Sequence, residues 1–324
     1  MIKHLPPEEY LRVLGSPSAN EKLEHRGKEL VCAQSGMSHP IRNLIIEFVD
    51  AGRLDAEKAR ELQGNTIAQT PDVIELYANK HTWSEFYSHF TNLKIRRLIK
   101  FLRRVNCERL VALGCGTGYE LRHLLGSGLS VKTIFASDLS YTMLSVVPHT
   151  LKTFDVELCL FTSDLDDCPV QATDIPVLIY EALHHTGDMH ATIRHLMSRS
   201  YENILFVEPT TNLVMRYFEK RGLARRVEYS GVKPDRLVIS KLKTLCREFG
   251  YRMARQSLWE MPEDHFRKIC PRPGKLQTAL LASLNAIGTL ATPVIRGNTS
   301  IVHLRRTSGS ARNISDRSRV NKAA

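Results

Sequence analysis

The sequence predicts a doubly wound α/β fold, in which a mostly parallel sheet carries helices on both faces. Five short apolar runs recur between residues 109 and 209, each of a length suited to a buried strand. The first run ends in a glycine-rich turn, Gly114-Cys115-Gly116-Thr117-Gly118, and a helical pattern starts directly after it. A strand, a glycine turn and a helix form the small-molecule cradle of such sheets.

The spacing of the glycines separates ligand classes. A dinucleotide-binding turn follows G-x-G-x-x-G, and its last glycine would fall at Tyr119. The third glycine is instead Gly118, and no G-x-x-x-x-G-K-[ST] pattern of a P-loop is present. Taken alone, the turn is equally well explained as an ordinary tight connection between a strand and a helix.

The later apolar runs end in polar residues. The predicted second strand ends in Asp138, where sheets of this kind bind a ribose diol. The alternative is that Asp138 or Ser140 caps the next helix. The next three predicted strands cover residues 156–164 with Asp164 at the end, residues 175–185 running into His184 and His185, and residues 203–209.

At these positions the chain resembles the class I S-adenosylmethionine-dependent methyltransferases. The resemblance is carried by the glycine turn, by the D-x-S-x-x-M-L segment that starts at Asp138, by Asp164 and by the histidine pair. It implies a Rossmann-like, seven-stranded, mostly parallel sheet and the cofactor S-adenosyl-L-methionine. The cofactor site that it implies consists of Gly114, Cys115, Gly116, Thr117, Gly118, Asp138, Leu139, Met143, Asp164 and Leu165.

One position departs from the family's pattern. The resemblance places the methionine part of the cofactor over the glycine turn, the ribose at Asp138 and the adenine amine at Asp164. The family usually has an acid two residues before the first glycine, where this chain has Ala112. A carboxylate for the cofactor ammonium is then missing or comes from elsewhere. Glu120 is the candidate substitute, and an ordinary acid in the first turn of a helix is the alternative explanation.

The loop after the fourth predicted strand holds the candidate catalytic residues, since the resemblance implies that it faces the transferred methyl group. His185 is the first candidate for a general base and His184 the second, because histidine titrates near neutrality. Glu181 is a carboxylate on the same loop that acts instead or attracts the sulfonium. A packing or loop-capping role explains the histidines equally well.

The chain divides into three predicted parts. Residues 1–91 are expected to form a helical extension outside the sheet, which caps the cofactor cleft or packs as a helix pair. Residues 92–307 are expected to form the core, with helical inserts at about 210–234 and 262–297. Residues 308–324 form a basic tail that we expect to be disordered. The other predicted core elements are a basic helix at 94–104, a helix at 235–249, and strands at 252–259 and 300–305.

The second insert contains twenty residues without a charge, at 276–295. That length suits a membrane span, but polar residues and a proline dilute the stretch, so no span is expected. A buried lid helix or a homodimer contact is expected in its place. We predict an acceptor site built from residues 82–87, residues 181–188, the segment after residue 210 and this insert.

The cysteine count and the net charge narrow the classes of metal, cofactor and substrate that the protein is expected to bind. Seven cysteines without a C-x-x-C pair favour reduced thiols over disulfides or a zinc site, and no apolar leader is visible, so a cytoplasmic protein with no metal is expected. The net charge of +11 suggests a nucleic-acid substrate, but the basic residues are scattered along the sequence and do not form one basic segment. We therefore expect methyl transfer to oxygen or nitrogen of a small, largely apolar molecule. The alternatives are an RNA methyltransferase and a catalytically inactive binding or assembly subunit.

Overall fold

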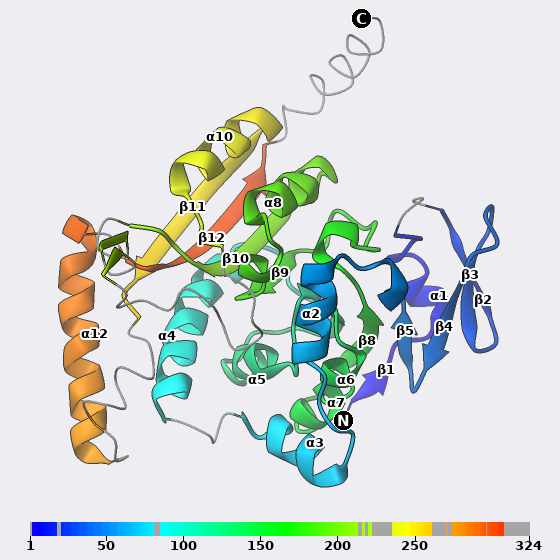
Figure 1. The fold of residues 1–324 in the computed structure, drawn as a ribbon, viewed down its shortest axis with the longest axis horizontal. Helices are drawn as coiled ribbons and strands as arrows, with labels where there is room; N and C mark the ends of the chain where they lie inside the picture. Colours follow the sequence, from blue (N-terminus) through cyan, green and yellow to red (C-terminus); the bar gives the residue numbers. More distant parts are fainter. Residues whose placement is uncertain are drawn as a thin grey trace, which may run out of the picture.

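A single twisted sheet runs through the computed structural model of the chain, with helices on both of its faces (Figure 1). The structure describes residues 2–17, 21–80, 85–212, 216–217, 220–221, 235–260, 270, 274–295 and 297–307.

Seven strands form the central part of the sheet, in the order β8-β7-β6-β9-β10-β12-β11. All of them run parallel except β12, which is antiparallel to both of its neighbours. The predicted mostly parallel sheet is therefore confirmed. The strands are β6 (Arg109–Leu113), β7 (Thr133–Asp138), β8 (Glu157–Thr162), β9 (Val177–Tyr180), β10 (Asn203–Pro209), β11 (Tyr251–Leu258) and β12 (Thr299–Arg306).

The direction in which the chain adds strands reverses between β6 and β9, which lie side by side. Sheets of this type bind their ligands at such a switch point, outside the carboxyl ends of the strands. The fold therefore directs attention to the loops that follow β6, β7, β8 and β9.

Both faces of the sheet are buried, which explains why its strands are continuous apolar runs. Leu110 and Ala112 of β6 pack with α4 and α5 on one face, and Val111 and Leu113 pack with α8 and α10 on the other. These helices are α4 (Glu85–Leu102), α5 (Tyr119–Gly126), α8 (Met189–Ser198) and α10 (Ile239–Phe249). Shorter helical elements are α6 (Tyr141–Leu144), α7 (Val147–Thr150), η3 (Leu165–Asp167) and η4 (Leu183–His185).

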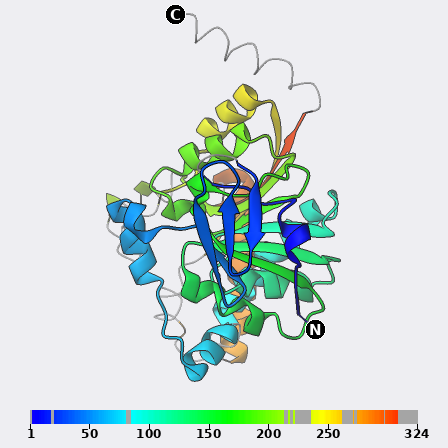
Figure 2. The ribbon, with the colours of Figure 1, turned by 90° about the vertical axis from the view of Figure 1, so that its right-hand side faces the viewer.

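The first fifty residues form strands, so the predicted helical extension is wrong for this part of the chain. β5 pairs in parallel with the edge strand β8, and β4, β3 and β2 continue outward as antiparallel strands, visible at the right of Figure 1 and facing the viewer in Figure 2. The short β1 also pairs with β8. These strands are β1 (Lys3–His4), β2 (Leu23–Arg26), β3 (Glu29–Cys32), β4 (Ser38–Arg42) and β5 (Ile45–Glu47).

The error has a local cause. Ile41, Leu44, Ile45 and Phe48 have the spacing of one helix face, yet Leu44 lies in the tight turn between β4 and β5. The second half of the extension is helical as expected, with α2 (Ala56–Gly64) and α3 (Pro71–Ala78), whereas α1 (Pro7–Tyr10) and η1 (Ala51–Arg53) are single turns. The predicted division into domains stays a prediction.

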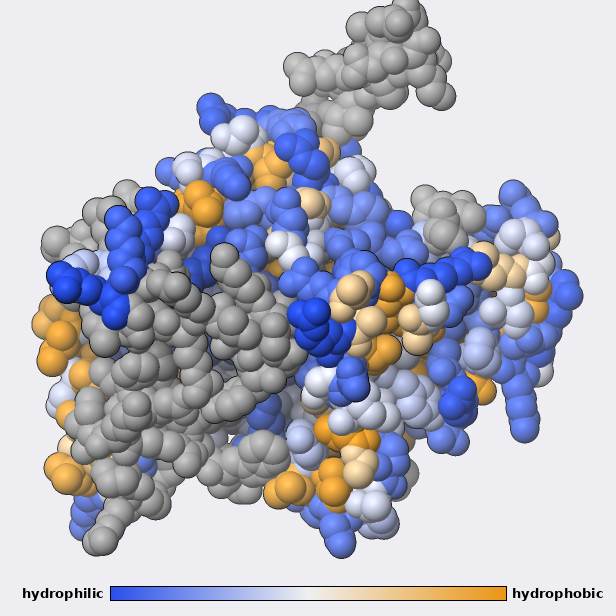
Figure 3. Space-filling view, viewed as in Figure 1, coloured by the Kyte–Doolittle hydropathy of each residue, from blue (hydrophilic) through white to orange (hydrophobic). Residues whose placement is uncertain are grey.

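The charge-free insert is one long helix, α12 (Lys275–Ile295), at the left of Figure 1. Gln277 and Leu281 are buried, but Leu276, Ile287 and Leu290 are 76%, 62% and 79% exposed. Figure 3 shows apolar side chains along this helix at the surface. The predicted buried helix is therefore wrong, because only one face of α12 packs against the sheet. The described helices include none that is long and apolar enough to cross a membrane.

Two other predicted segments fall outside the described residues. These are most of the insert at 210–234 and the whole basic tail at 308–324. The seven cysteines are all described; each is buried, and none forms a disulfide.

Candidate functional site

A cavity of about 270 Å³ lies at the switch point of the sheet. The loops after β6, β7, β8 and β9 form most of its wall, and α2 from the N-terminal part closes one side. The predicted site residues that line it are Gly114, Cys115, Gly116, Thr117, Asp138, Leu139, Met143, Asp164, Leu165, Glu181 and His185. Gly118 and His184 are not among the lining residues.

The glycine turn has a backbone that needs glycine. Gly114 has φ of +66°, and a Cβ atom there would lie 2.5 Å from the Cβ of Ala182. Gly116 has φ of +51°, and no atom lies within 4 Å of the place where its Cβ would stand. Gly118, also at positive φ, is the N-cap of α5. The turn is therefore tight against the loop after β9 and leaves open space at Gly116.

Asp138 joins the ends of β6 and β7. Its carboxylate accepts hydrogen bonds from the backbone N–H groups of Gly116, at 2.8 Å, and Ser140, at 2.9 Å. Burial raises the pKa of Asp138, which these two hydrogen bonds oppose. Each carboxylate oxygen has two lone pairs, so both retain a site for a ligand hydroxyl. Ser140 caps α6 in addition, by accepting from Met143 N–H.

Asp164 follows β8 and is already partnered from a distant part of the chain. Its Oδ2 lies 2.5 Å from Lys58 Nζ, which also lies 2.8 Å from Asp166 Oδ2. Its Oδ1 accepts from the N–H of Asp166. Lys58 of α2 thereby attaches the N-terminal part to the wall of the cavity.

The two histidines have different surroundings. His184 is buried, and its Nδ1 lies 2.7 Å from the fully buried carboxylate of Glu208, which also accepts the N–H groups of Ala182 and Leu183. His185 lines the cavity, and its Nδ1 lies 3.3 Å from Glu61 Oε2 of α2. Of the pair, His185 is therefore the one that lines the cavity, and His184 fixes the loop.

A buried ion cluster stands behind Glu181. Lys94 of α4 is buried, and its Nζ lies 2.5 Å from Glu181 Oε1 and 2.8 Å from Glu260 Oε1. Burial by itself would lower the pKa of Lys94, but the two carboxylates raise it well above its usual value. Lys94 is therefore held as a cation.

Glu120 brings a second buried carboxylate to the cavity wall, at the start of α5. Burial raises its pKa to about 8, against its own backbone N–H and the nearby Lys80. The carboxylates of Asp138 and Glu181 raise it further. Glu120 lines the same cavity as the glycine turn, and whether it replaces the acid missing at position 112 stays a prediction.

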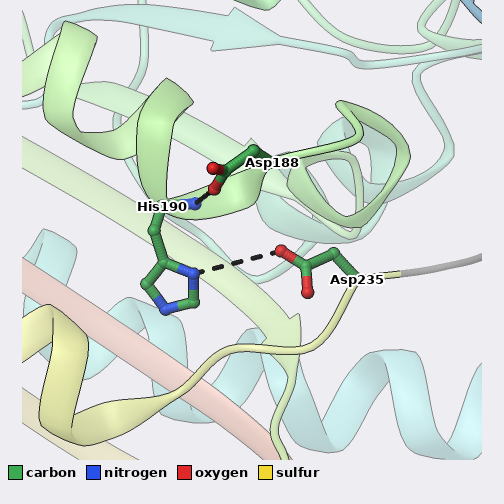
Figure 4. Close-up of side chains that lie close together, drawn as sticks. All are labelled: Asp188, His190 and Asp235. Atoms are coloured by element: carbon green, nitrogen blue, oxygen red, sulfur yellow. Dashed lines mark hydrogen bonds and ion pairs between the residues drawn. The ribbon is translucent and has the colours of Figure 1, made fainter.

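Another cluster of ionisable groups lies outside the cavity. Figure 4 shows Asp188, His190 and Asp235. Each offers one side-chain nitrogen or oxygen atom that could bind a metal ion, and these atoms lie within 4.8 Å of one another. His190 Nε2 lies 3.1 Å from the N–H of Val238, and its Nδ1 lies 3.9 Å from Asp235 Oδ2. Asp188 accepts two N–H groups at the start of α8. These contacts connect α8 to the segment before α10, which is a structural role.

Sequence reasoning missed the residues that the cavity takes from before the first core strand. These are Lys58, Glu61, Asn65 and Lys80, together with Lys94 behind the wall. No known sequence motif places these residues at a fixed distance from the glycine turn or the later acids. The full burial of Lys94 would indicate a functional site, but it is visible only in the structure.

The acceptor site predicted from four segments stays a prediction, and one of the four segments lines the cavity. Glu181, Ala182, His185 and Thr186 line the cavity, whereas none of the α12 residues whose side chains the structure describes does. Residues 82–84 and most of the segment after residue 210 lie outside the described residues. The described part of α12 packs beside β11, which counts against the predicted place of the charge-free insert at the acceptor site.

The strand order and the glycine turn define a Rossmann-like α/β protein. No family model matches the chain, and no curated protein does. Among solved structures, it is similar to magnesium protoporphyrin IX methyltransferase from Synechocystis with bound SAH, at 15% identity, 77% of this chain, 94% of that chain and a TM-score of 0.44.

Two further solved structures are similar. One is the complex of the Haloferax volcanii Trm112 methyltransferase activator with a putative methyltransferase, at 16% identity, 78% of this chain, 98% of that chain and a TM-score of 0.46. The other is Haemonchus contortus phosphoethanolamine N-methyltransferase 2, at 11% identity, 66% of this chain, 53% of that chain and a TM-score of 0.42. At such identities the function has to be inferred from this chain's own residues.

Proposed function

We propose that this protein is a class I methyltransferase that uses S-adenosyl-L-methionine to methylate oxygen or nitrogen of a small molecule. The observation that carries the proposal is the joint placement of three features around one cavity. A glycine turn with open space lies after β6, Asp138 ends β7, and Asp164 follows β8. A cofactor with a sulfonium, a ribose diol and an adenine offers one group to each of them.

The residues fit that cofactor. Gly116 leaves room for a ligand to approach the backbone. The oxygens of Asp138 accept one hydrogen bond each from the protein and can accept one more from a ribose hydroxyl. Leu165 and Met143 both line the cavity and supply apolar surface for an adenine ring.

The bound cofactor would supply a methyl group already activated by its positively charged sulfur. The protein then has to align the acceptor with that methyl group and exclude water. We assign to His185 the role of general base where the acceptor carries a proton, with Glu61 at Nδ1 to stabilise the imidazolium. We assign to His184 a structural role in the loop after β9, because its Nδ1 already contacts the carboxylate of Glu208.

The acceptor is proposed as a small molecule because the cavity is closed on one side by α2 and lined by convergent polar groups. Its predicted apolar character rested partly on the charge-free insert, which lies elsewhere. A largely apolar acceptor now depends on residues 82–87 and on the segment after residue 210.

The decisive test is binding of S-adenosylmethionine and S-adenosylhomocysteine in calorimetry. We expect saturable binding of both, and a loss of at least about tenfold in affinity for Asp138→Ala, because two ligand hydroxyls lose their acceptor. Asp174→Ala is the matched control, since Asp174 is exposed and pairs with Arg109 at the amino-terminal end of β6. Absence of binding by the wild-type protein would refute the proposal.

A catalytically inactive subunit with the same fold is the second candidate, favoured by the apolar Ala112 at a position where an acid is usual. The two candidates differ in turnover. Incubation of the protein with labelled cofactor and a metabolite extract should give a product one methyl heavier, and His185→Ala should abolish it while retaining cofactor binding. Cofactor binding without any labelled product would favour the inactive subunit.

A further inference from the structure

The cluster behind the cavity contains more negative than positive charge. One ammonium, that of Lys94, faces two carboxylates, those of Glu181 and Glu260. The side chain of Lys94 is 2% exposed, so water contributes little to balancing the cluster. Glu260 is additionally held by a hydrogen bond from Thr299, at 3.2 Å. With both carboxylates ionised, the cluster leaves one unit of negative charge on the wall of the cavity; burial raises the pKa of Glu260, Lys94 lowers it and Glu181 raises it.

The excess charge is directed to the cavity through Glu181. This residue is the first after β9 and has φ of +51°, a conformation that non-glycine residues rarely adopt. Its N–H donates to the carbonyl of Val207 at 2.8 Å, which fixes the backbone, and its carboxylate is 26% exposed and lines the cavity. Such strain persists only where the surroundings enforce it.

The place of Glu181 relative to the glycine turn is also fixed. Its neighbour Ala182 lies against Gly114, so Glu181 stands beside the turn. Glu120 adds no full negative charge at this end of the cavity near neutral pH, because burial raises its pKa to about 8, and the cation Lys80 lies 5.8 Å over the ring of Tyr119. Lys58 is engaged with Asp164 and Asp166.

We propose that Glu181, held in place by Lys94, which also pairs with Glu260, binds the sulfonium of the methyl donor, so that the site prefers the charged donor to its neutral by-product. This inference rests on the proposed function. A carboxylate beside the glycine turn meets the part of the donor that carries the positive sulfur. A neutral thioether in the same place leaves the excess charge of the cluster unpaired.

The preference has a consequence for turnover. In the transfer, the bond between the methyl carbon and sulfur breaks, and the acceptor atom forms a new bond to that carbon. The sulfur keeps the electron pair and becomes neutral, and the proton of the acceptor goes to the general base. The attraction between Glu181 and the ligand therefore ends with the reaction, which favours exchange of the by-product for fresh donor.

The test is the ratio of the two dissociation constants, for S-adenosylhomocysteine over S-adenosylmethionine, measured by calorimetry. For Glu181→Gln we expect this ratio to fall roughly tenfold relative to wild type, because an opposite charge at contact distance contributes about that factor or more. Glu181→Asp keeps the charge and should retain most of the preference. Glu108→Gln, at the opposite end of β6, is the control and should leave the ratio unchanged.

Melting curves of all variants separate a folding defect from a binding effect. If Glu181→Gln does not fold, the wild-type ratio decides alone, and a protein that binds the neutral by-product tenfold more tightly than the donor contradicts the proposal. An unchanged ratio in folded Glu181→Gln also overturns it while leaving the proposed function intact. Failure of wild type to bind either compound would instead defeat the proposed function.

Discussion

Glu120 links the protonation of a single side chain to the stability of the fold. Its pKa is about 8 in the folded protein, and an unfolded chain returns it to its ordinary value near 4.5. Between these values the folded state binds the extra proton. The stabilisation is therefore complete below about pH 4.5 and is lost as the pH rises through about 8.

For the ligand-free protein we expect the free energy of unfolding to decrease between pH 5 and pH 8, at up to about 1.4 kcal/mol per pH unit from this group. Glu120→Gln cannot ionise, so it should flatten this dependence and raise the melting temperature at pH 8. Urea unfolding of both proteins at several pH values measures the effect. Parallel curves for wild type and variant would show that Glu120 is ionised in the folded state.

Glu208 illustrates a residue whose importance is structural although it stands beside the site. It is fully buried and accepts hydrogen bonds from Ala182 N–H, Leu183 N–H and His184. Glu208→Ala leaves these donors unpaired, so we expect a loss of about 3–5 kcal/mol in unfolding free energy. Chemical denaturation measures it. A loss below about 1 kcal/mol would mean that the loop finds other partners.

At the scale of elements, the sequence predicts the buried strands well and the short exposed ones badly. β6 to β10 are continuous apolar runs because both of their faces are covered. β6 is followed by Gly114, β7 ends in Asp138 and β9 is followed by Glu181. β2 to β5 have only three to five residues each, so they are too short to show a clear period of two.

The turn between β4 and β5 explains the rest of that failure. A two-residue hairpin turn is usually recognised in a sequence by a glycine, which adopts positive φ easily. In this turn Asn43 and Leu44 adopt φ of +48° and +66° instead. Leucine is unusual in this conformation, and Leu44 is also exposed. Without a glycine, nothing in the sequence interrupts the apparent helix.

In the same turn, we predict that a substitution to glycine increases the stability of the protein, whereas such substitutions usually decrease it. Leu44→Gly should stabilise the protein by about 1 kcal/mol, because it removes left-handed strain from an exposed residue. Leu76→Gly, at an exposed position inside α3, is the matched control and should destabilise it by about 1 kcal/mol. Thermal unfolding of both variants tests the pair. Destabilisation of comparable size in both would contradict the turn conformation.

At the scale of the whole molecule, the site joins parts of the chain that no motif connects. The four loops of the switch point were predictable, because the carboxyl ends of parallel strands meet at one edge of the sheet. The part of the cavity wall formed by α2 was not predictable from the sequence, because Lys58 and Asp164 are separated by 106 residues. Its position depends on the pairing of β5 with β8, which only the folded sheet reveals.

Lys58→Met tests this connection. It leaves the partly buried carboxylates of Asp164 and Asp166 without their cation, so we expect a loss of about 1–2 kcal/mol in unfolding free energy and weaker binding of S-adenosylmethionine. Lys132→Met removes an exposed ion pair with Glu108 and should change neither quantity. Equal behaviour of the two variants would show that α2 does not depend on this bridge.

The burial of Lys94 turns this residue into a built-in chemical reporter. Amine-acylating reagents need a deprotonated, accessible amine, and Lys94 is enclosed between two carboxylates with its pKa raised well above the usual value. Its acylation therefore requires α4 to separate from the loop after β9. Mass spectrometry of the Lys94 peptide over time would count these opening events without any introduced label, and a ligand that closes the cavity should slow them.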